Sequence, residues 1–335
     1  MTTTGQDSAT AELDTGSGIT ASAVDGRHRY AHTLLATART AAQATMRAMV
    51  TRLDPDLARV CAYHLGWTDT TAAGDGKALR PALAVAGAAL IGVERELGAR
   101  CAAVVELLHN FSLIHDDIMD HDTTRRGRPT VWARYGTPTG VLAGDALFAL
   151  AIATLTEIDT PTRRGGRLVS DTMIELVRGQ QQDLSFQARP WTGVDAVGVE
   201  EYVVMAGNKT GALLGCALAL PAACTPTIPA AVVNALISTG RHLGVAFQAI
   251  DDILGIWGQE NITGKPVCSD LTAGKKTLPV LTALAADTTE VLARTLQGST
   301  GVEEKDQGAA ARAIVDAGGR RASRGIAERE SFIKD

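Results

Sequence analysis

The chain has 335 residues, a formal net charge of −5 and 45% hydrophobic residues, of which few are aromatic. An acidic chain gives no basis for nucleic-acid binding, which depends on basic surfaces. The apolar residues are mostly Ala, Leu and Val, a composition that favours closely packed helices over sheets. Five cysteines without a Cys-x-x-Cys pair, and no signal peptide, indicate reduced thiols and a cytoplasmic protein. No uninterrupted apolar run is long enough to predict a membrane span.

The amino-terminal residues 1–26 are rich in Thr, Ser, Gly and Ala and contain little that could be buried. Such a segment is expected to be a disordered tail, with inert disorder favoured over the alternative that it docks a partner. Residues 27–335 contain no linker-like stretch. We therefore expect them to form a single all-helical domain.

Apolar periodicity predicts helices along the whole of this domain. Asp54-Pro55 reads as a helix start, Gly127–Thr130 as a turn and Pro221–Pro229 as a loop. The expected helices cover residues 27–53, 55–65, from 77 onward, 97–120, 132–140, 144–158, 163–186, 198–220 with an interruption at 207–211, 230–257, 275–286, 288–297 and 303–318. The prediction is an all-α fold, one bundle of ten or more helices around a central cavity.

The first chemically informative motif is an acidic cluster at the end of the 97–120 helix. Asp116 and Asp120 are four residues apart, so both carboxylates project from one helix face. No Lys or Arg at the next turn neutralises them, and hard oxygen ligands of this kind suit Mg²⁺. Arg125 and Arg126 follow, with guanidinium groups that match phosphate oxygens. The alternative is a solvated acidic surface, but the preceding apolar run favours a site for a metal and a diphosphate.

A second acidic pair, Asp251 and Asp252, lies on the 230–257 helix and is followed by Lys265 and Asp270. Two helices with acidic pairs in one alanine-rich chain can face each other across a cavity. The metal cations of a metal-bound diphosphate between them would neutralise the negative charge of both sets of carboxylates. The sequence therefore predicts one site built from both motifs.

These motifs, in this order over residues 28–330, resemble the trans-type isoprenyl diphosphate synthases of the polyprenyl synthetase family, most closely the geranylgeranyl type. The resemblance implies condensation of isopentenyl diphosphate with an allylic diphosphate (dimethylallyl, geranyl or farnesyl). It also implies three Mg²⁺ ions with substrate bound, and a homodimer.

The resemblance assigns roles to individual residues. The metal ligands are Asp116, Asp120 and Asp251, with Asp117 in support and Asp252 orienting metal-bound water. Isopentenyl diphosphate is held by Lys77, Arg80, His109 and Arg126, and the allylic diphosphate by Arg125, Lys209 and Lys265. Thr210 and Gln248 stabilise the cation or assist proton transfer. Gln180 and Asp183 line the cavity, with a salt bridge on the helix surface as the alternative for Asp183.

The sequence departs from the family in two places. Gly255 stands where the second motif, usually DDxxD, has its last aspartate, which predicts weaker metal binding rather than lost chemistry. The segment after Gly318-Gly319 ends sooner than the closing helix expected of the family. Because of these departures, a non-catalytic or regulatory subunit remains an alternative function. A class I terpene cyclase is a second alternative, but it would need no anchors for a second diphosphate, so Lys77, Arg80 and His109 argue against it.

Product length is argued from Phe111, which lies five residues before Asp116, about 7.5 Å along the helix axis. A ring there is a natural floor for the growing tail, and the smaller Ser112 leaves space beside it. By resemblance, an aromatic residue at this place goes with a C20 product, geranylgeranyl diphosphate. A C15 farnesyl product usually needs a second bulky residue at position 112 or an insertion within the motif, and neither is present.

Overall fold

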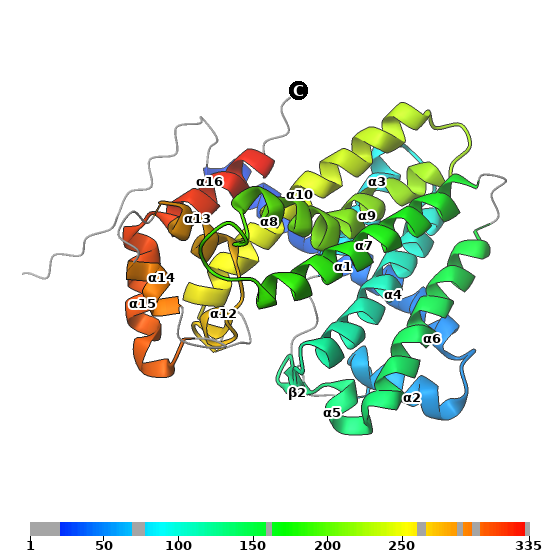
Figure 1. Ribbon diagram of the computed structural model, residues 1–335. Coiled ribbons are helices and arrows are strands. Elements are labelled where there is room, and N and C mark those ends of the chain that lie inside the picture. The colour runs from blue at the N-terminus through cyan, green and yellow to red at the C-terminus, as the bar shows by residue number, and fades with distance from the viewer. Residues whose placement is uncertain are drawn as a thin grey trace, which may run out of the picture.

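The computed structural model describes residues 21–68, 78–158, 163–259, 266–286, 291–296 and 302–331. These residues are almost entirely helical (Figure 1), as predicted. The helices are α1 (Ala21–Val50), α2 (Pro55–His64), α3 (Leu79–Leu90), α4 (Arg95–Met119), α5 (Val131–Tyr135), α6 (Thr137–Thr156), α7 (Arg164–Ala188), α8 (Val199–Ala206), the π-helix η1 (Gly207–Gly211), α9 (Ala212–Ala223), α10 (Ala230–Trp257), α12 (Ser269–Thr272), α13 (Leu278–Ala286), α14 (Val291–Leu296), α15 (Glu304–Asp316) and α16 (Gly319–Ser331).

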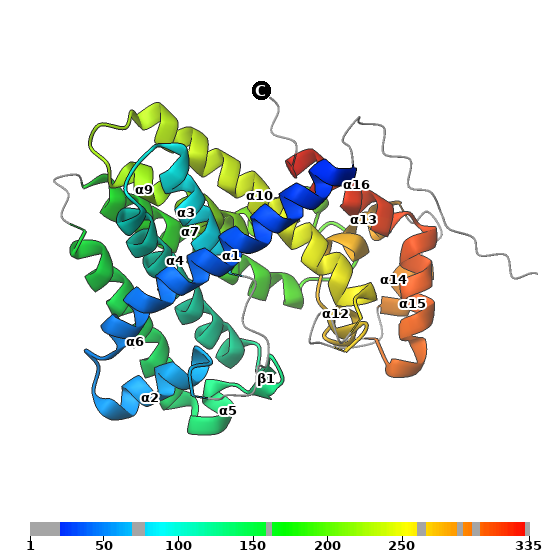
Figure 2. The same ribbon diagram turned by 180° about the vertical axis from the view of Figure 1, so that it is seen from behind.

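The helix α4 lies at the centre of the larger half of the molecule. It packs against α1, α3, α6 and α9, and α1 crosses the back of the fold beside it (Figure 2). Small buried residues on α4, such as Ala102 and Ala103, let these helices approach closely, which is why an alanine-rich chain builds this core. The long helix α10 joins this half to the smaller group formed by α12–α16 (Figure 1).

Local signals set several boundaries as predicted. The Asp54 carboxylate caps α2 by accepting hydrogen bonds from the N–H groups of Asp56 and Leu57, both at 3.1 Å, with Pro55 at the first position of the helix. The turn at Gly127 is also present, with φ at 71°, but it joins two short strands that the sequence did not predict, β1 (Thr124–Arg125) and β2 (Arg128–Pro129). Two-residue strands are too short to show a pattern.

Elsewhere the structure corrects the predicted boundaries. The 198–220 helix is not interrupted at 207–211 but continues through the π-helix η1. The loop predicted from Pro221 begins later, because Pro221 lies inside α9, whose residues are all buried. Packing on every side there outweighs the cost of the missing proline N–H. At the amino terminus α1 begins at Ala21, six residues before the expected start, while the first twenty residues of the predicted disordered tail lie outside the described residues.

The carboxyl-terminal segment forms a closing helix, α16, which the sequence analysis did not expect. It packs on α10 and α13 and buries Ser323, Ile326 and Ala327. Most of its residues are charged or small, so its apolar stripe is too narrow to be read from the sequence.

Three helical segments are long and apolar enough, by length and composition, to cross a membrane: Arg95–Met119, Thr137–Thr156 and Val199–Ala223. The expectation that no segment qualifies is therefore not confirmed. In the fold, 56%, 44% and 83% of their respective apolar windows are buried. Much of this apolar surface is used in packing one helix against another.

Candidate active site

The first acidic motif lies at the carboxyl end of α4. Asp120 is the residue that ends the helix, and its N–H donates to the Asp116 carbonyl at 2.8 Å, so the two carboxylates keep the predicted one-turn spacing. Burial raises the pKa of Asp116 to about 6, although Lys209 opposes the shift. Among the described residues the buried Oδ1 atom of Asp120 has no hydrogen-bond partner. Buried carboxylates that are close together and lack a hydrogen-bond partner are suited to binding a cation.

Asp117 points to a different neighbour. Its buried Oδ1 accepts from Arg125 Nε at 2.8 Å, and an Arg125 terminal nitrogen lies 2.6 Å from the same atom. This pair fixes the β1–β2 hairpin to α4 and positions Arg125 beside the motif. Asp117, predicted to support the metal ligands, thus holds an arginine that was assigned to the allylic diphosphate.

The second acidic motif lines a cavity of about 340 Å³ between α7, α8, η1, α10 and the α12–α13 segment. Its polar lining residues include Asp183, Lys209, Gln248, Asp251, Asp252, Asp270, Lys275, Lys276 and Thr277. Residues from distant parts of the sequence therefore share one cavity.

Asp252 joins three elements of the cavity wall. Its carboxylate accepts hydrogen bonds from the Tyr202 hydroxyl of α8, from Gln248 Nε2 at 2.9 Å and from the Leu278 N–H at 2.8 Å. Burial raises its pKa to about 7, against the effect of these hydrogen bonds. Three protein partners thus already occupy the carboxylate that the sequence analysis assigned to metal-bound water.

The π-helix η1 presents Lys209 to the same cavity and buries Thr210 beside it. A Cβ atom on Gly179 of α7 would lie only 2.3 Å from the Lys209 backbone nitrogen, so this close approach requires glycine. Lys209 Nζ lies 2.5 Å from Asp183 Oδ2. Thr210 Oγ1 donates to Gln248 Oε1 at 2.8 Å, which continues the hydrogen-bonded chain to Asp252. Thr210 and Gln248, to which the resemblance gave cation-stabilising or proton-transfer roles, are thus hydrogen-bonded to each other.

Lys275 connects the two acidic motifs. It lines the cavity of the second motif, and its Nζ atom lies 3.2 Å from Asp120 Oδ2 of the first. Burial would lower the pKa of Lys275, but Asp120, Asp183 and Asp270 together raise it. Lys275 therefore links Asp120 of the first motif to the cavity that the second motif lines. Lys275 was left out of the sequence-based site, because a lysine near a helix start is usually exposed.

The residues assigned to isopentenyl diphosphate gather around His109, two helical turns before Asp116 on α4. Arg80 NH1 lies 3.1 Å from His109 Nε2. Burial and the neighbouring cations Arg80, Arg126 and Arg125 lower the pKa of His109 well below its usual value, so its ring is neutral. Lys77 and Lys265, assigned to the two diphosphates, lie outside the described residues.

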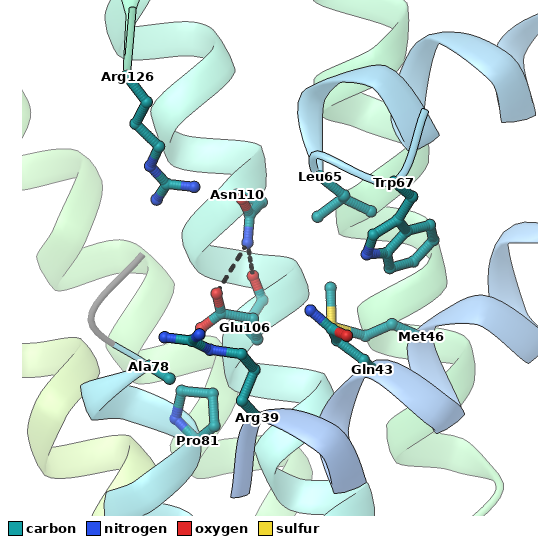
Figure 3. A pocket seen from close by; sticks show the side chains of 10 residues that line it. All are labelled: Arg39, Gln43, Met46, Leu65, Trp67, Ala78, Pro81, Glu106, Asn110 and Arg126. Carbon is teal, nitrogen blue, oxygen red and sulfur yellow. Dashed lines mark hydrogen bonds between the residues drawn. The ribbon is translucent and has the colours of Figure 1, made fainter. Parts of the chain in front are cut away.

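Figure 3 shows a pocket beside these cations, in which Glu106 of α4 lies between Arg39 of α1 and Arg126. Asn110 Nδ2 donates to the Glu106 carbonyl at 2.8 Å and to its carboxylate at 3.2 Å. Burial raises the pKa of Glu106, while Arg80, Arg126 and Arg39 counteract it. Sequence reasoning missed Glu106; the one available signal was a carboxylate one turn before His109 on an otherwise apolar helix.

Replacing Glu106 with glutamine is expected to raise the KM for isopentenyl diphosphate roughly ten-fold, as for the loss of a residue that orients ligand-binding groups. The amide keeps the volume but removes the charge that holds Arg80 and Arg126 in place. Steady-state kinetics with each substrate varied in turn checks this. Glu96→Gln, at an exposed position of the same helix, is the control. An equal rise in the KM for the allylic diphosphate would contradict a role of Glu106 that is confined to the isopentenyl diphosphate site.

Phe111 packs among aromatic rings rather than standing alone. Its ring centroid is 4.8 Å from that of His115 and 5.3 Å from that of Phe148 on α6. Ser112 Oγ donates to the His109 carbonyl at 2.8 Å, so its small side chain folds back on the helix. The predicted floor residue is therefore supported from α6 by Phe148, which no sequence pattern connected to α4.

The carboxylates suit Mg²⁺, but they are dispersed. Within the described ranges no three His, Cys, Asp or Glu side chains are close enough to hold an ion on their own. Asp116 and Asp120 offer two carboxylates, and among the described residues the buried Oδ1 of Asp120 has no hydrogen-bond partner; oxygen ligands are those that Mg²⁺ prefers. A bound diphosphate would have to supply further ligands, which fits the two-motif arrangement.

Comparison with known proteins agrees with this geometry. The family model described as polyprenyl synthetase matches residues 66–315. A (2E,6E)-farnesyl diphosphate synthase of Mycobacterium tuberculosis is 43% identical over 83% of this chain and 78% of its own length. A geranylgeranyl diphosphate synthase of the same organism is 43% identical over 71% of this chain and 68% of its own.

Solved structures show the same fold. A polyprenyl synthetase from Streptomyces coelicolor has a TM-score of 0.82 and 43% identity, covering 89% of this chain and 90% of its own. A polyprenyl synthase from Caulobacter crescentus, complexed with calcium and isoprenyl diphosphate, has a TM-score of 0.76 and 28% identity, covering 90% and 88%.

The helical fold and the paired acidic helices define a prenyltransferase that makes short-chain prenyl diphosphates. The chain belongs to the polyprenyl synthetase family.

Proposed function

We propose that this protein is a geranylgeranyl diphosphate synthase, which condenses isopentenyl diphosphate with dimethylallyl, geranyl or farnesyl diphosphate in a Mg²⁺-dependent, head-to-tail reaction. The observation that carries the proposal is that Lys275, which lines the cavity of the second acidic motif, pairs with Asp120 of the first motif, while Arg80 and the neutral His109 form a second polar cluster between α3 and α4. One site thus suits the allylic diphosphate and the other suits isopentenyl diphosphate.

The allylic site favours loss of the diphosphate. Bound Mg²⁺, for which we propose three ions with substrate present, would neutralise charge on the leaving group. Asp116 and Asp120 would hold Mg²⁺ on one wall of the site, and Asp251 would hold Mg²⁺ on the other. Lys209, Lys275 and Arg125 are already held near the carboxylates and would donate to the diphosphate oxygens as the allylic C–O bond breaks.

Nearer the amino end of α4, Arg80, His109 and Arg126 would fix the diphosphate of isopentenyl diphosphate. Its double bond would then supply the electron pair that forms the new carbon–carbon bond to the allylic C1 atom, and the adjacent carbon would lose a proton to an oxygen of the released diphosphate. The Gln248 amide lies on the cavity wall and is held by the buried Thr210 hydroxyl behind it, so its dipole can stabilise the positive charge.

The C20 product rests on the aromatic floor. Phe111 is braced by Phe148 and His115, and the neighbouring Ser112 leaves no second bulky group. The similarity to both a farnesyl and a geranylgeranyl synthase makes C15 the alternative product.

We also propose a homodimer in the cytoplasm. Exposed apolar side chains occur on the neighbouring helices α6 and α7, namely Val141, Leu142 and Ile152 on α6 and Ile174 and Val177 on α7. A face of this kind is suited to burial against a second copy.

Product analysis tests the proposal. The protein is incubated with Mg²⁺, isopentenyl diphosphate and each allylic primer, and the dephosphorylated alcohols are separated by length. A C20 alcohol supports the full proposal, and a C15 alcohol replaces it by a farnesyl synthase. A cyclic hydrocarbon formed without isopentenyl diphosphate would indicate a terpene cyclase. Substrate binding without turnover would indicate a non-catalytic subunit. Reactions without Mg²⁺ are the control.

A further inference from the structure

Gly255, the departure from the family's second acidic motif, is covered by a carboxylate from another part of the chain. A Cβ atom built on Gly255 would lie 1.9 Å from Asp270 Oδ2 and 2.5 Å from Asp270 Cγ. The Asp270 side chain of α12 therefore fills the space next to the backbone at position 255. Any residue larger than glycine there would displace it.

The backbone around Asp270 is tied to the end of α10. The Cys268 N–H donates to the Ile256 carbonyl at 3.2 Å, and Ser269 Oγ donates to the Gly255 carbonyl at 3.4 Å. After Asp270, the Lys275 N–H returns to the Asp270 carbonyl at 2.9 Å. Asp270 is thus held against α10 by the residues on either side of it, rather than resting there by chance.

The surroundings of Asp270 are suited to a cationic or diphosphate ligand. Asp251 and Asp270 line the same cavity, and so does Thr277. Thr277 is buried, and its hydroxyl has no hydrogen-bond partner within the part of the chain that the structure describes. The Lys275 ammonium also lies among these groups, paired with Asp120. A buried hydroxyl without a partner marks a place where a ligand or its water would complete the hydrogen bonds.

We propose that Asp270 supplies the carboxylate that the second acidic motif lacks at Gly255 and binds Mg²⁺ together with Asp251. The inference rests on the proposed function, and it deepens it by completing the metal site on the α10 wall. The motif is then split between two segments: Asp251 on α10 and Asp270 on α12, with Gly255 as the gap into which Asp270 fits. It predicts that Gly255 does not weaken metal binding, contrary to the expectation from sequence.

Moving the carboxylate tests this inference. Mn²⁺ binding is measured by electron paramagnetic resonance of the free ion, with inorganic pyrophosphate as the probe for the diphosphate group. Asp270→Asn is expected to weaken pyrophosphate-dependent Mn²⁺ binding roughly ten-fold or more. In Gly255→Asp/Asp270→Ala the carboxylate returns to position 255, in the space that Asp270 vacates, and binding is expected to recover. Asp316→Asn, exposed on α15, is the control and should bind as the unchanged chain does.

Two results would overturn the inference. One is Mn²⁺ binding by Asp270→Asn equal to that of the unchanged chain. The other is a folded double variant, checked by circular dichroism, that binds as weakly as Asp270→Ala alone. The double variant keeps the test decisive if Asp270→Asn itself does not fold. A protein that binds Mn²⁺ through Asp270 but forms no prenyl diphosphate would preserve this inference and remove the proposed reaction.

Discussion

Replacing Asp116 with asparagine is expected to lower kcat/KM for prenyl transfer by about three orders of magnitude, a loss similar to that of a principal group stabilising the transition state. Asparagine keeps the shape of the side chain but removes the negative charge that would hold a cation against the leaving diphosphate. Asp116 already lies among Lys209, Arg125, Asp120 and Asp183, whose charges act on it. Initial rates with radiolabelled isopentenyl diphosphate at saturating Mg²⁺ measure the effect.

The matched control is Asp171→Asn, because Asp171 is exposed on α7 and only forms a surface ion pair with Arg167. Its kcat/KM should stay within a factor of two of the unchanged chain, since exposed ion pairs contribute little. If Asp116→Asn retained more than a tenth of the activity while remaining folded, Asp116 would not be a principal metal ligand.

Replacing Phe111 with alanine is expected to change the main product to alcohols longer than that of the unchanged chain. Removing the ring opens space about 7.5 Å along α4 from Asp116, where the growing tail would otherwise end. The fold should tolerate the change at a cost of about 3 kcal/mol or less, because Phe111 is only partly buried. Chromatography of the dephosphorylated products gives the chain lengths directly.

Phe148→Ala should lengthen the product as well, but less, because Phe148 supports Phe111 from α6. Phe186→Leu is the control: Phe186 is buried in a separate cluster with Tyr202 and Met205, so it should lower stability without altering product length. An unchanged product from Phe111→Ala would show that the tail does not end at this ring, and would remove the main argument for C20.

Parts of the site whose groups lie close together in sequence could be predicted from it. The i and i+4 spacing of Asp116 and Asp120 requires only helix geometry, and the Asp54 cap requires only neighbouring residues. Phe111 was placed near the motif by the same reasoning. Missed residues were mostly those whose partner is distant in sequence: Phe148 meets Phe111, and Asp270 lies over Gly255.

The amino-acid sequence alone thus determined the helical class, the two acidic motifs and the family, since these depend on periodicity and on residue type at short spacing. The tertiary structure decided how those groups are used. In the fold Asp252 accepts a hydrogen bond from Tyr202, Asp117 pairs with Arg125, and Lys275 pairs with Asp120. Only the packing of α10 against α12 placed a carboxylate at Gly255, because the contact depends on where two helices meet and not on the residues within either one.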